Sequence, residues 1–124
     1  MITAMTDAMT ELASFELLSL ECRTGSNGTL RYYNAQGQLH REHGPAVEYS
    51  DGSYEWRYHG LLHRLDGPAV ESSDVYREWC QNGRRHRLDG PAVEWTNGSK
   101  FWYINGVWLT KATWHRQVAS MEAV

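Results

Sequence analysis

The sequence has little cysteine and no long apolar run. Two cysteines, Cys22 and Cys80, are too few for a disulfide framework, and they form no Cys-x-x-Cys site. No apolar stretch approaches the ~18 residues of a membrane span. The N-terminus lacks a basic region followed by an apolar run, the pattern of a signal peptide. We therefore expect a cytoplasmic protein without a membrane-spanning segment.

An excess of charge of one sign is also missing. The net charge of −3 is too small to mark a nucleic-acid binder or an acidic tail, and lysine occurs only at Lys100 and Lys111. Aromatic residues are plentiful instead, with six tryptophans and seven tyrosines. Together with arginine, these are the residues that dominate binding hot spots. Strands also favour aromatics, so a thin β core explains them equally well.

Proline is scarce too, and its three positions reveal a repeat. Pro45, Pro68 and Pro91 follow one another at intervals of 23 residues. The phrase His-Arg-Glu-His-Gly-Pro-Ala-Val-Glu begins at His40 and returns, as His-Arg-Leu-Asp-Gly-Pro-Ala-Val-Glu, at His63 and His86. The same interval separates the tryptophans and glycines that come later in each unit: Trp56, Trp79 and Trp102, then Gly60, Gly83 and Gly106. Self-similarity at a fixed period of this size indicates stacked supersecondary units.

We assign the whole chain, residues 1–124, to a single domain. Residues 38–60, 61–83 and 84–106 are the three repeats, and residues 17–37 are a degenerate copy. We expect residues 1–16 to form an N-terminal helical segment, because Met5, Met9 and Leu12 recur at helical spacing. Residues 107–124 form a C-terminal cap whose helix follows the N-cap residue Thr110.

Each unit is expected to form a β-hairpin. Residues 46–50 are strand-like, Asp51-Gly52 is a two-residue turn signal, and residues 53–58 are the return strand. The third unit has Asn97-Gly98 at the same place, whereas the second has Asp74-Val75 and should form a turn that is looser or of another type. The predicted fold is mainly β: an elongated antiparallel meander of stacked β-hairpins with short N- and C-terminal helices.

Strand alternation divides the side chains between two faces. We expect the three tryptophans on one face with Val47, Val70 and Val93 as the packing between hairpins, joined by Tyr54, Tyr58 and Ile104. Arg57, Cys80, Tyr103 and Phe101 are expected on the opposite face. Both faces then hold apolar groups that something must cover. The candidate partner-binding residues are Tyr54, Arg57, Tyr58, Arg77, Arg84, Arg85, Phe101 and Tyr103.

The recurring histidines, His40, His63 and His86, raise the question of a metal or an active site. Zinc ligands must lie ~2.0–2.1 Å from the ion, whereas equivalent residues of stacked hairpins are about 10 Å apart. His63 is close to Asp66 in sequence, and His86 to Asp89, but a repeated pair does not resemble a singular active site. We predict no metal, no cofactor and no catalysis.

Structural roles account for these residues instead. We expect each histidine to pack or to form a hydrogen bond in its turn. Asp66 and Asp89 should close the turns through side-chain-to-backbone bonds. Three arginine–glutamate pairs should fix the register of the sheet: Arg41 with Glu48, Arg64 with Glu71, and Arg87 with Glu94.

The order Trp, Gly, His, Gly resembles the MORN repeat, the membrane occupation and recognition nexus motif. The match is closer to a MORN-like variant, Asn-Gly-x-x-His-Arg-x-Asp-Gly-Pro-Ala, that occurs in uncharacterised proteins of bacteriophages and bacteria. The resemblance covers about residues 37–106 and extends weakly to residue 18. It implies a β-hairpin array and binding rather than catalysis. The prolines at 45, 68 and 91 stand where the MORN pattern has a second glycine.

Three classes of function follow. The first is a protein-interaction module, in one version a phage-encoded inhibitor of a host defence protein (anti-CRISPR-like) that acts in the host cytoplasm. Binding at a membrane or lipid surface, as in MORN proteins, is the second, and the acidic chain argues against it. The third is nucleic-acid binding or mimicry, which the net charge also disfavours. A homodimer is a further possibility, since it would cover a sheet that is apolar on both faces.

Overall fold

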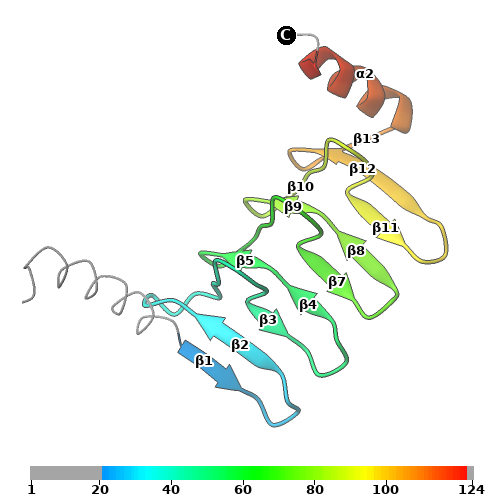
Figure 1. Cartoon of the computed structure of the whole chain (residues 1–124). Helices are drawn as coiled ribbons and strands as arrows, with labels where there is room; N and C mark the ends of the chain where they lie inside the picture. Colours follow the sequence, from blue (N-terminus) through cyan, green and yellow to red (C-terminus); the bar gives the residue numbers. More distant parts are fainter. Residues whose placement is uncertain (1–20, 123–124) are drawn as a thin grey trace, which may run out of the picture.

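A computed structural model describes residues 21–122, and within that range the protein is mainly β. Nine strands form one antiparallel sheet, and a single helix, α2 (Lys111–Glu122), follows it (Figure 1). The predicted N-terminal helix and residues 17–20 of the degenerate copy lie outside the described residues. The C-terminal helix is confirmed, and the Thr110 hydroxyl caps it by accepting the Thr113 amide at 3.1 Å.

The sheet strands follow one another in chain order. They are β1 (Glu21–Thr24), β2 (Leu30–Tyr33), β3 (Val47–Glu48), β4 (Tyr54–Glu55), β7 (Val70–Ser72), β8 (Tyr76–Glu78), β11 (Val93–Trp95), β12 (Lys100–Ile104) and β13 (Val107–Leu109). Two short ribbons extend from it: β5 (Arg57–Tyr58) with β6 (Leu61–Leu62), and β9 (Cys80–Gln81) with β10 (Arg84–Arg85). The return strand predicted over residues 53–58 is therefore interrupted at Trp56, whose amide turns to the Ala69 carbonyl.

Two kinds of turn connect the strands. At His59-Gly60, Asn82-Gly83 and Asn105-Gly106 both residues have positive φ. The Asp51-Gly52 and Asn97-Gly98 turns are three-residue loops rather than two-residue turns, because the amide of Tyr49 bonds the carbonyl of Ser53 and that of Trp95 bonds Ser99. The second unit differs as predicted: Asp74 takes the positive φ there.

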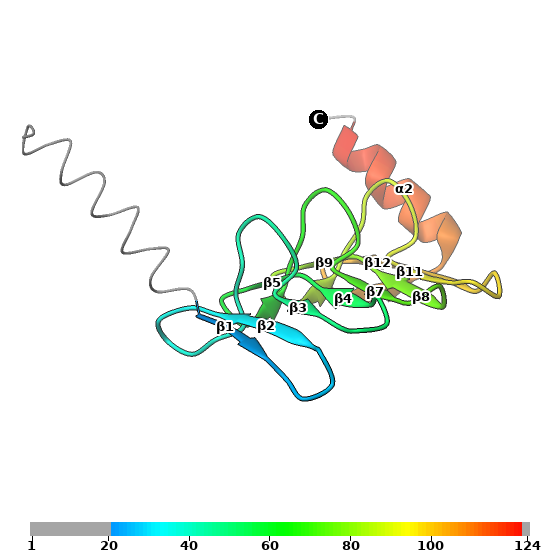
Figure 2. The same cartoon turned by 60° about the horizontal axis from the view of Figure 1, so that its bottom comes forward.

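Three loops cover one face of the sheet. Residues 40–46, 63–69 and 86–92, which contain the repeated phrase, rise on the same side of the sheet as α2 (Figure 2). We call this side the loop face and the other side the open face. The loops supply the cover that the apolar sheet was expected to need on this side.

An arginine in each loop stacks on the aromatic ring beneath it. The guanidinium of Arg87 lies 3.7 Å from the Trp79 ring centroid, and those of Arg64 and Arg41 lie 4.0 Å from Trp56 and Tyr32. Helix α2 takes this role at the C-terminal end, where Trp114 packs 4.6 Å from Trp102. The tryptophans thus face the loops.

The valines lie on the other face, contrary to the sequence prediction. Val47 pairs directly with Glu55, and Val93 with Phe101, in the strand register. Directly paired residues share a face, and Glu55 precedes Trp56, so the valines and tryptophans point to opposite sides. The most buried residues are the small ones beside the strands, Ala46, Ala69 and Ala92, each 0% exposed, followed by Val47, Cys80 and Thr29 at 1%.

Candidate functional site

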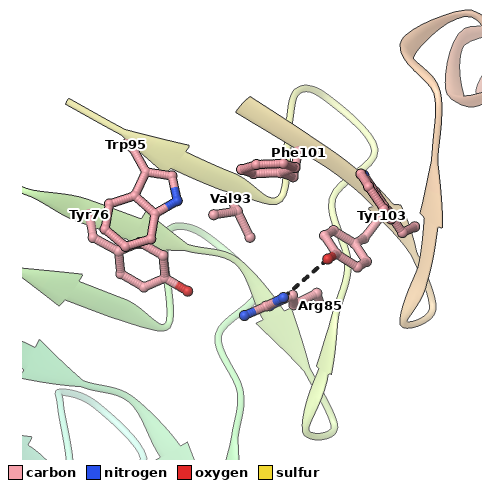
Figure 3. Close-up of a pocket in the computed structure, with 7 residues that line it drawn as sticks. Tyr76, Arg85, Val93, Trp95, Phe101 and Tyr103 are labelled. Atoms are coloured by element: carbon pink, nitrogen blue, oxygen red, sulfur yellow. Dashed lines mark hydrogen bonds between the residues drawn. The ribbon is translucent and has the colours of Figure 1, made fainter. Parts of the chain in front are cut away.

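The open face carries an aromatic groove near the C-terminal end of the sheet (Figure 3). It encloses about 460 Å³. Strands β8, β11, β12 and β13 and the ribbon strand β10 supply its lining: Tyr76, Arg85, Val93, Trp95, Phe101, Tyr103 and Trp108. Trp108 is 67% exposed and Trp95 41% exposed, so large apolar side chains face solvent here.

Cross-strand pairing brings the aromatic rings together. Tyr76 lies opposite Trp95 in the register of β8 and β11, and their ring centroids are 4.5 Å apart. Trp108 on β13 lies opposite Tyr103 on β12, which puts it diagonal to Phe101. The rings of Phe101 and Trp108 meet edge to face, with their centroids 6.0 Å apart. Such pairs are a main source of stability on a sheet face, and they hold the groove walls in place.

One cation lies in the groove. The Arg85 guanidinium donates from Nη1 to the Tyr103 hydroxyl at 3.1 Å, drawn as the dashed line in Figure 3, and its Nε lies 3.3 Å from Glu78 Oε1. The Arg85 side chain is still 43% exposed, which leaves guanidinium surface for an incoming acidic group.

A carboxylate beneath the groove gathers several donors. Glu78 is 12% exposed and accepts bonds from the Tyr76 hydroxyl and, at 3.1 Å, from the Cys80 thiol. Burial, followed by the nearby Glu78 carboxylate, raises the pKa of the Cys80 thiol far above its usual range. Cys80 is therefore a packed thiol and not a nucleophile at neutral pH.

The structure separates the eight predicted partner-binding residues. Arg85, Phe101 and Tyr103 line the groove, and Arg57 lies on the same face, paired with Glu55 at 2.8 Å. Tyr54 and Arg77 lie on the loop face, where Tyr54 accepts from Arg64 and Arg77 pairs with Glu71. Tyr58 and Arg84 flank the positive-φ turns of the two ribbons.

Sequence reasoning missed Tyr76, Trp95 and Trp108, although a signal for them was present. One period earlier, the residues at these positions are Ser53, Ser72 and Arg85. The two aromatic residues that were predicted, Phe101 and Tyr103, also differ from their equivalents one period earlier, which are Glu78 and Cys80 in the second unit. Departures from the repeat, rather than the repeat itself, mark the groove.

The repeated phrase, by contrast, serves the loop face. Arg87 Nε contacts Asp89 at 2.9 Å, and its Nη1 donates to the Pro91 carbonyl at 3.0 Å and to Glu94 at 2.7 Å. A Cβ built on Gly90 would lie only 2.7 Å from the Arg87 Cζ, so the glycine makes room for the stacked guanidinium. The loops at Pro45 and Pro68 repeat the bond from arginine to the proline carbonyl.

Two predictions for this face need correction. Asp66 and Asp89 bind the guanidinium groups of Arg64 and Arg87 rather than backbone amides, because each arginine reaches across its own turn. Of the expected pairs, Arg41–Glu48 and Arg87–Glu94 form, at 2.8 and 2.7 Å. Arg64 instead donates to the Tyr54 hydroxyl at 3.4 Å, while Glu71 pairs with Arg77.

Each histidine of the repeat binds the positive-φ turn at the end of its own unit. The Nδ1 atoms of His40, His63 and His86 accept the backbone amides of His59, Asn82 and Asn105 at 2.9, 3.0 and 2.9 Å. These donors are the first residues of the positive-φ turns. Burial lowers the pKa of His40 and of His86, and a neighbouring imidazole, His59, adds to the effect at His40.

Within residues 21–122, no group of three or more His, Cys, Asp or Glu side chains is placed to hold a metal ion. In the same part of the chain, no helix has the length and apolarity needed to cross a membrane.

Comparison with known proteins returned no match: no family model, no curated protein and no solved structure is similar to this chain.

Proposed function

We propose that this chain is a non-enzymatic protein-interaction module, built as a MORN-like array of stacked hairpins, that binds a partner protein through the open face. The supporting observation is the contrast between the two faces. The loop face repeats the stacked arginine and its bond to the proline carbonyl in successive units. The open face, apart from its recurring valines, changes from unit to unit and has its tryptophans, Trp95 and Trp108, at one end.

The groove has the composition of a binding hot spot. Its tryptophans, tyrosines and arginine are the residue types that most often dominate interface energies. Trp95 and Trp108 are held by ring contacts with Tyr76 and Phe101, so they lose little conformational freedom when a partner covers them. Because β13 forms one wall, the groove also borders the last strand in the order of the described sheet.

An array with a constant framework and a variable face suits recognition better than chemistry. The repeated residues stabilise each unit, and substitutions on the open face change the surface without disturbing that framework. A phage-encoded inhibitor of a host defence protein remains one specific version of this proposal.

The test uses the full chain as bait and takes its variants from the repeat. Trp95→Ser and Trp108→Arg install the residues found one period earlier in the chain, Ser72 and Arg85, which the same framework already accommodates. The control is Leu65→Glu, which copies Glu42 onto a loop-face residue that is 75% exposed. Wild type and control should capture one protein in stoichiometric amount from the source cell or its host.

Each groove variant should weaken that capture by at least ~30-fold, the ratio that corresponds to a hot-spot loss of 2 kcal/mol. Equal capture by all three variants would contradict the proposal, as would recovery of background proteins alone.

A further inference from the structure

We propose that the aromatic groove receives the N-terminal segment, residues 2–18, of a second copy of this chain, so that two copies exchange their segments in a dimer. The inference rests on the proposed function, because it names an occupant for the same groove.

The chemistry of the segment fits the groove. Residues 1–20 contain three acidic side chains, Asp7, Glu11 and Glu16, and no lysine or arginine. The groove offers the half-exposed guanidinium of Arg85 as its cation. Opposite charges on the two surfaces favour their association and set its orientation.

The apolar residues of the segment match the aromatic walls. Met5, Met9, Leu12 and Phe15 recur at the spacing of one helix face. Methionine sulfur makes favourable contacts with aromatic rings, and its flexible side chain fills irregular grooves. An amphipathic segment with anchors at this spacing commonly binds to a partner by laying its apolar face in a groove.

The reach of the segment favours a second copy over the same chain. From β1 to β11, at the centre of the groove, the sheet order has six steps, or about 29 Å at ~4.8 Å per step. Five extended residues, 16–20, would span about 17 Å, and a helix over residues 6–15 would be about 15 Å long. The far end of such a helix could reach the groove of the same chain, but Leu12 and Phe15 would lie at most about 22 Å from β1, short of the groove centre.

A two-fold dimer removes this restriction. The segment precedes β1, and the groove is formed by strands at the other end of the sheet order, so two copies placed side by side in opposite directions would bring each segment to the other copy's groove. Each copy gives one segment and accepts one, which closes the assembly at two chains.

The test compares two doubly substituted full-length chains. Leu12→Asp/Phe15→Asp places charges on the proposed contact face, and Thr10→Asp/Ser14→Asp adds the same charge at polar positions of the same segment. We expect wild type and the Thr10/Ser14 variant to sediment at twice the chain mass of 14.3 kDa. The Leu12/Phe15 variant should sediment as a monomer, with dimer affinity at least ~30-fold weaker.

A second readout locates the contact. In nitrogen–proton correlation spectra, the Leu12/Phe15 variant should shift the indole signals of Trp95 and Trp108, while that of Trp79 on the loop face stays in place and shows that the fold is intact. A monomeric wild type, a dimer that survives the Leu12/Phe15 change, or unshifted Trp95 and Trp108 signals would each overturn the inference. Trp108-dependent capture of another protein by a chain that stays monomeric would leave the proposed function standing.

Discussion

The histidine bonds to the positive-φ turns predict that mild acid destabilises the fold. An Nδ1 atom that accepts a backbone amide must be unprotonated, so a proton added to His40 or His86 removes the bond that ties it to its turn. Burial already lowers the pKa of both imidazoles in the folded chain. We therefore expect the free energy of unfolding to decrease as the pH falls below neutrality.

The sign follows from proton uptake. An unfolded histidine has a pKa of about 6.5, and the folded pKa of each of these two residues is lower. At a pH between the two values the unfolded chain binds more protons, so stability increases with pH. The contribution is complete above the unfolded pKa and is lost as the pH falls through the folded one.

The expected size comes from the bonds. A net hydrogen bond contributes about 1 kcal/mol, so loss of the bonds at His40 and His86 should remove about 2 kcal/mol as the pH falls from above about 6.5 through the lowered folded pKa values. The carboxylates respond at lower pH. The Tyr54 hydroxyl lowers the pKa of Glu71, and the Ser53 amide lowers that of Asp51. The free energy of unfolding that these two carboxylates contribute is therefore lost only below about pH 4.5.

Urea unfolding followed by tryptophan fluorescence measures the effect at several pH values. In the variant His40→Asn/His86→Asn, an amide oxygen replaces Nδ1 as acceptor and cannot be protonated in this range. The variant should lose most of the pH dependence and keep most of the stability at neutral pH. An equal slope in wild type and variant, or a flat wild-type profile, would refute the role of these bonds.

Three further changes test the loop face by urea unfolding. Arg87→Met should cost about 2–3 kcal/mol, because it removes the stack on Trp79 and the bonds to neighbouring acceptors; a loss below about 0.5 kcal/mol would contradict that role. Gly90→Ala should cost nearly as much, because the new Cβ displaces the same guanidinium. In an Arg87→Met background, where that guanidinium is already absent, Gly90→Ala should add little further loss of stability. Trp114→Ala should cost about 3–5 kcal/mol, since Trp114 is 4% exposed, packs on Trp102 and donates to the Arg87 carbonyl.

Local sequence signals predicted the turns and the helix because short-range chemistry determines both. Glycine takes positive φ at no steric cost, as at Gly60, Gly83 and Gly106, and the Thr110 cap needs only the amide of Thr113. The bonds of Asp66 could not be assigned in this way. Backbone amides and the Arg64 guanidinium are both within reach of that carboxylate, and the choice depends on where Trp56 holds the arginine.

The wrong prediction for the valines shows how one additional residue in a hairpin loop changes which side chains share a face. Counting along residues 46–58 with simple alternation gives no reason to separate Val47 from Trp56, because the turn between them can contain two residues or three. The structure has the three-residue loop, and its extra residue reverses the side on which the return strand presents Trp56.

This register decides which residues are free to bind. The rings of Trp56 and Trp79 are covered by arginine and that of Trp102 by Trp114, so none of the three is available to a partner. The surface that remains is the one on which Glu55 and Arg57 of the first unit give way to Phe101 and Tyr103 of the last. In a repeat of this kind, the residues that recur explain the folding of each unit. The residues that do not recur, once the register assigns them to the uncovered face, are where recognition should be sought.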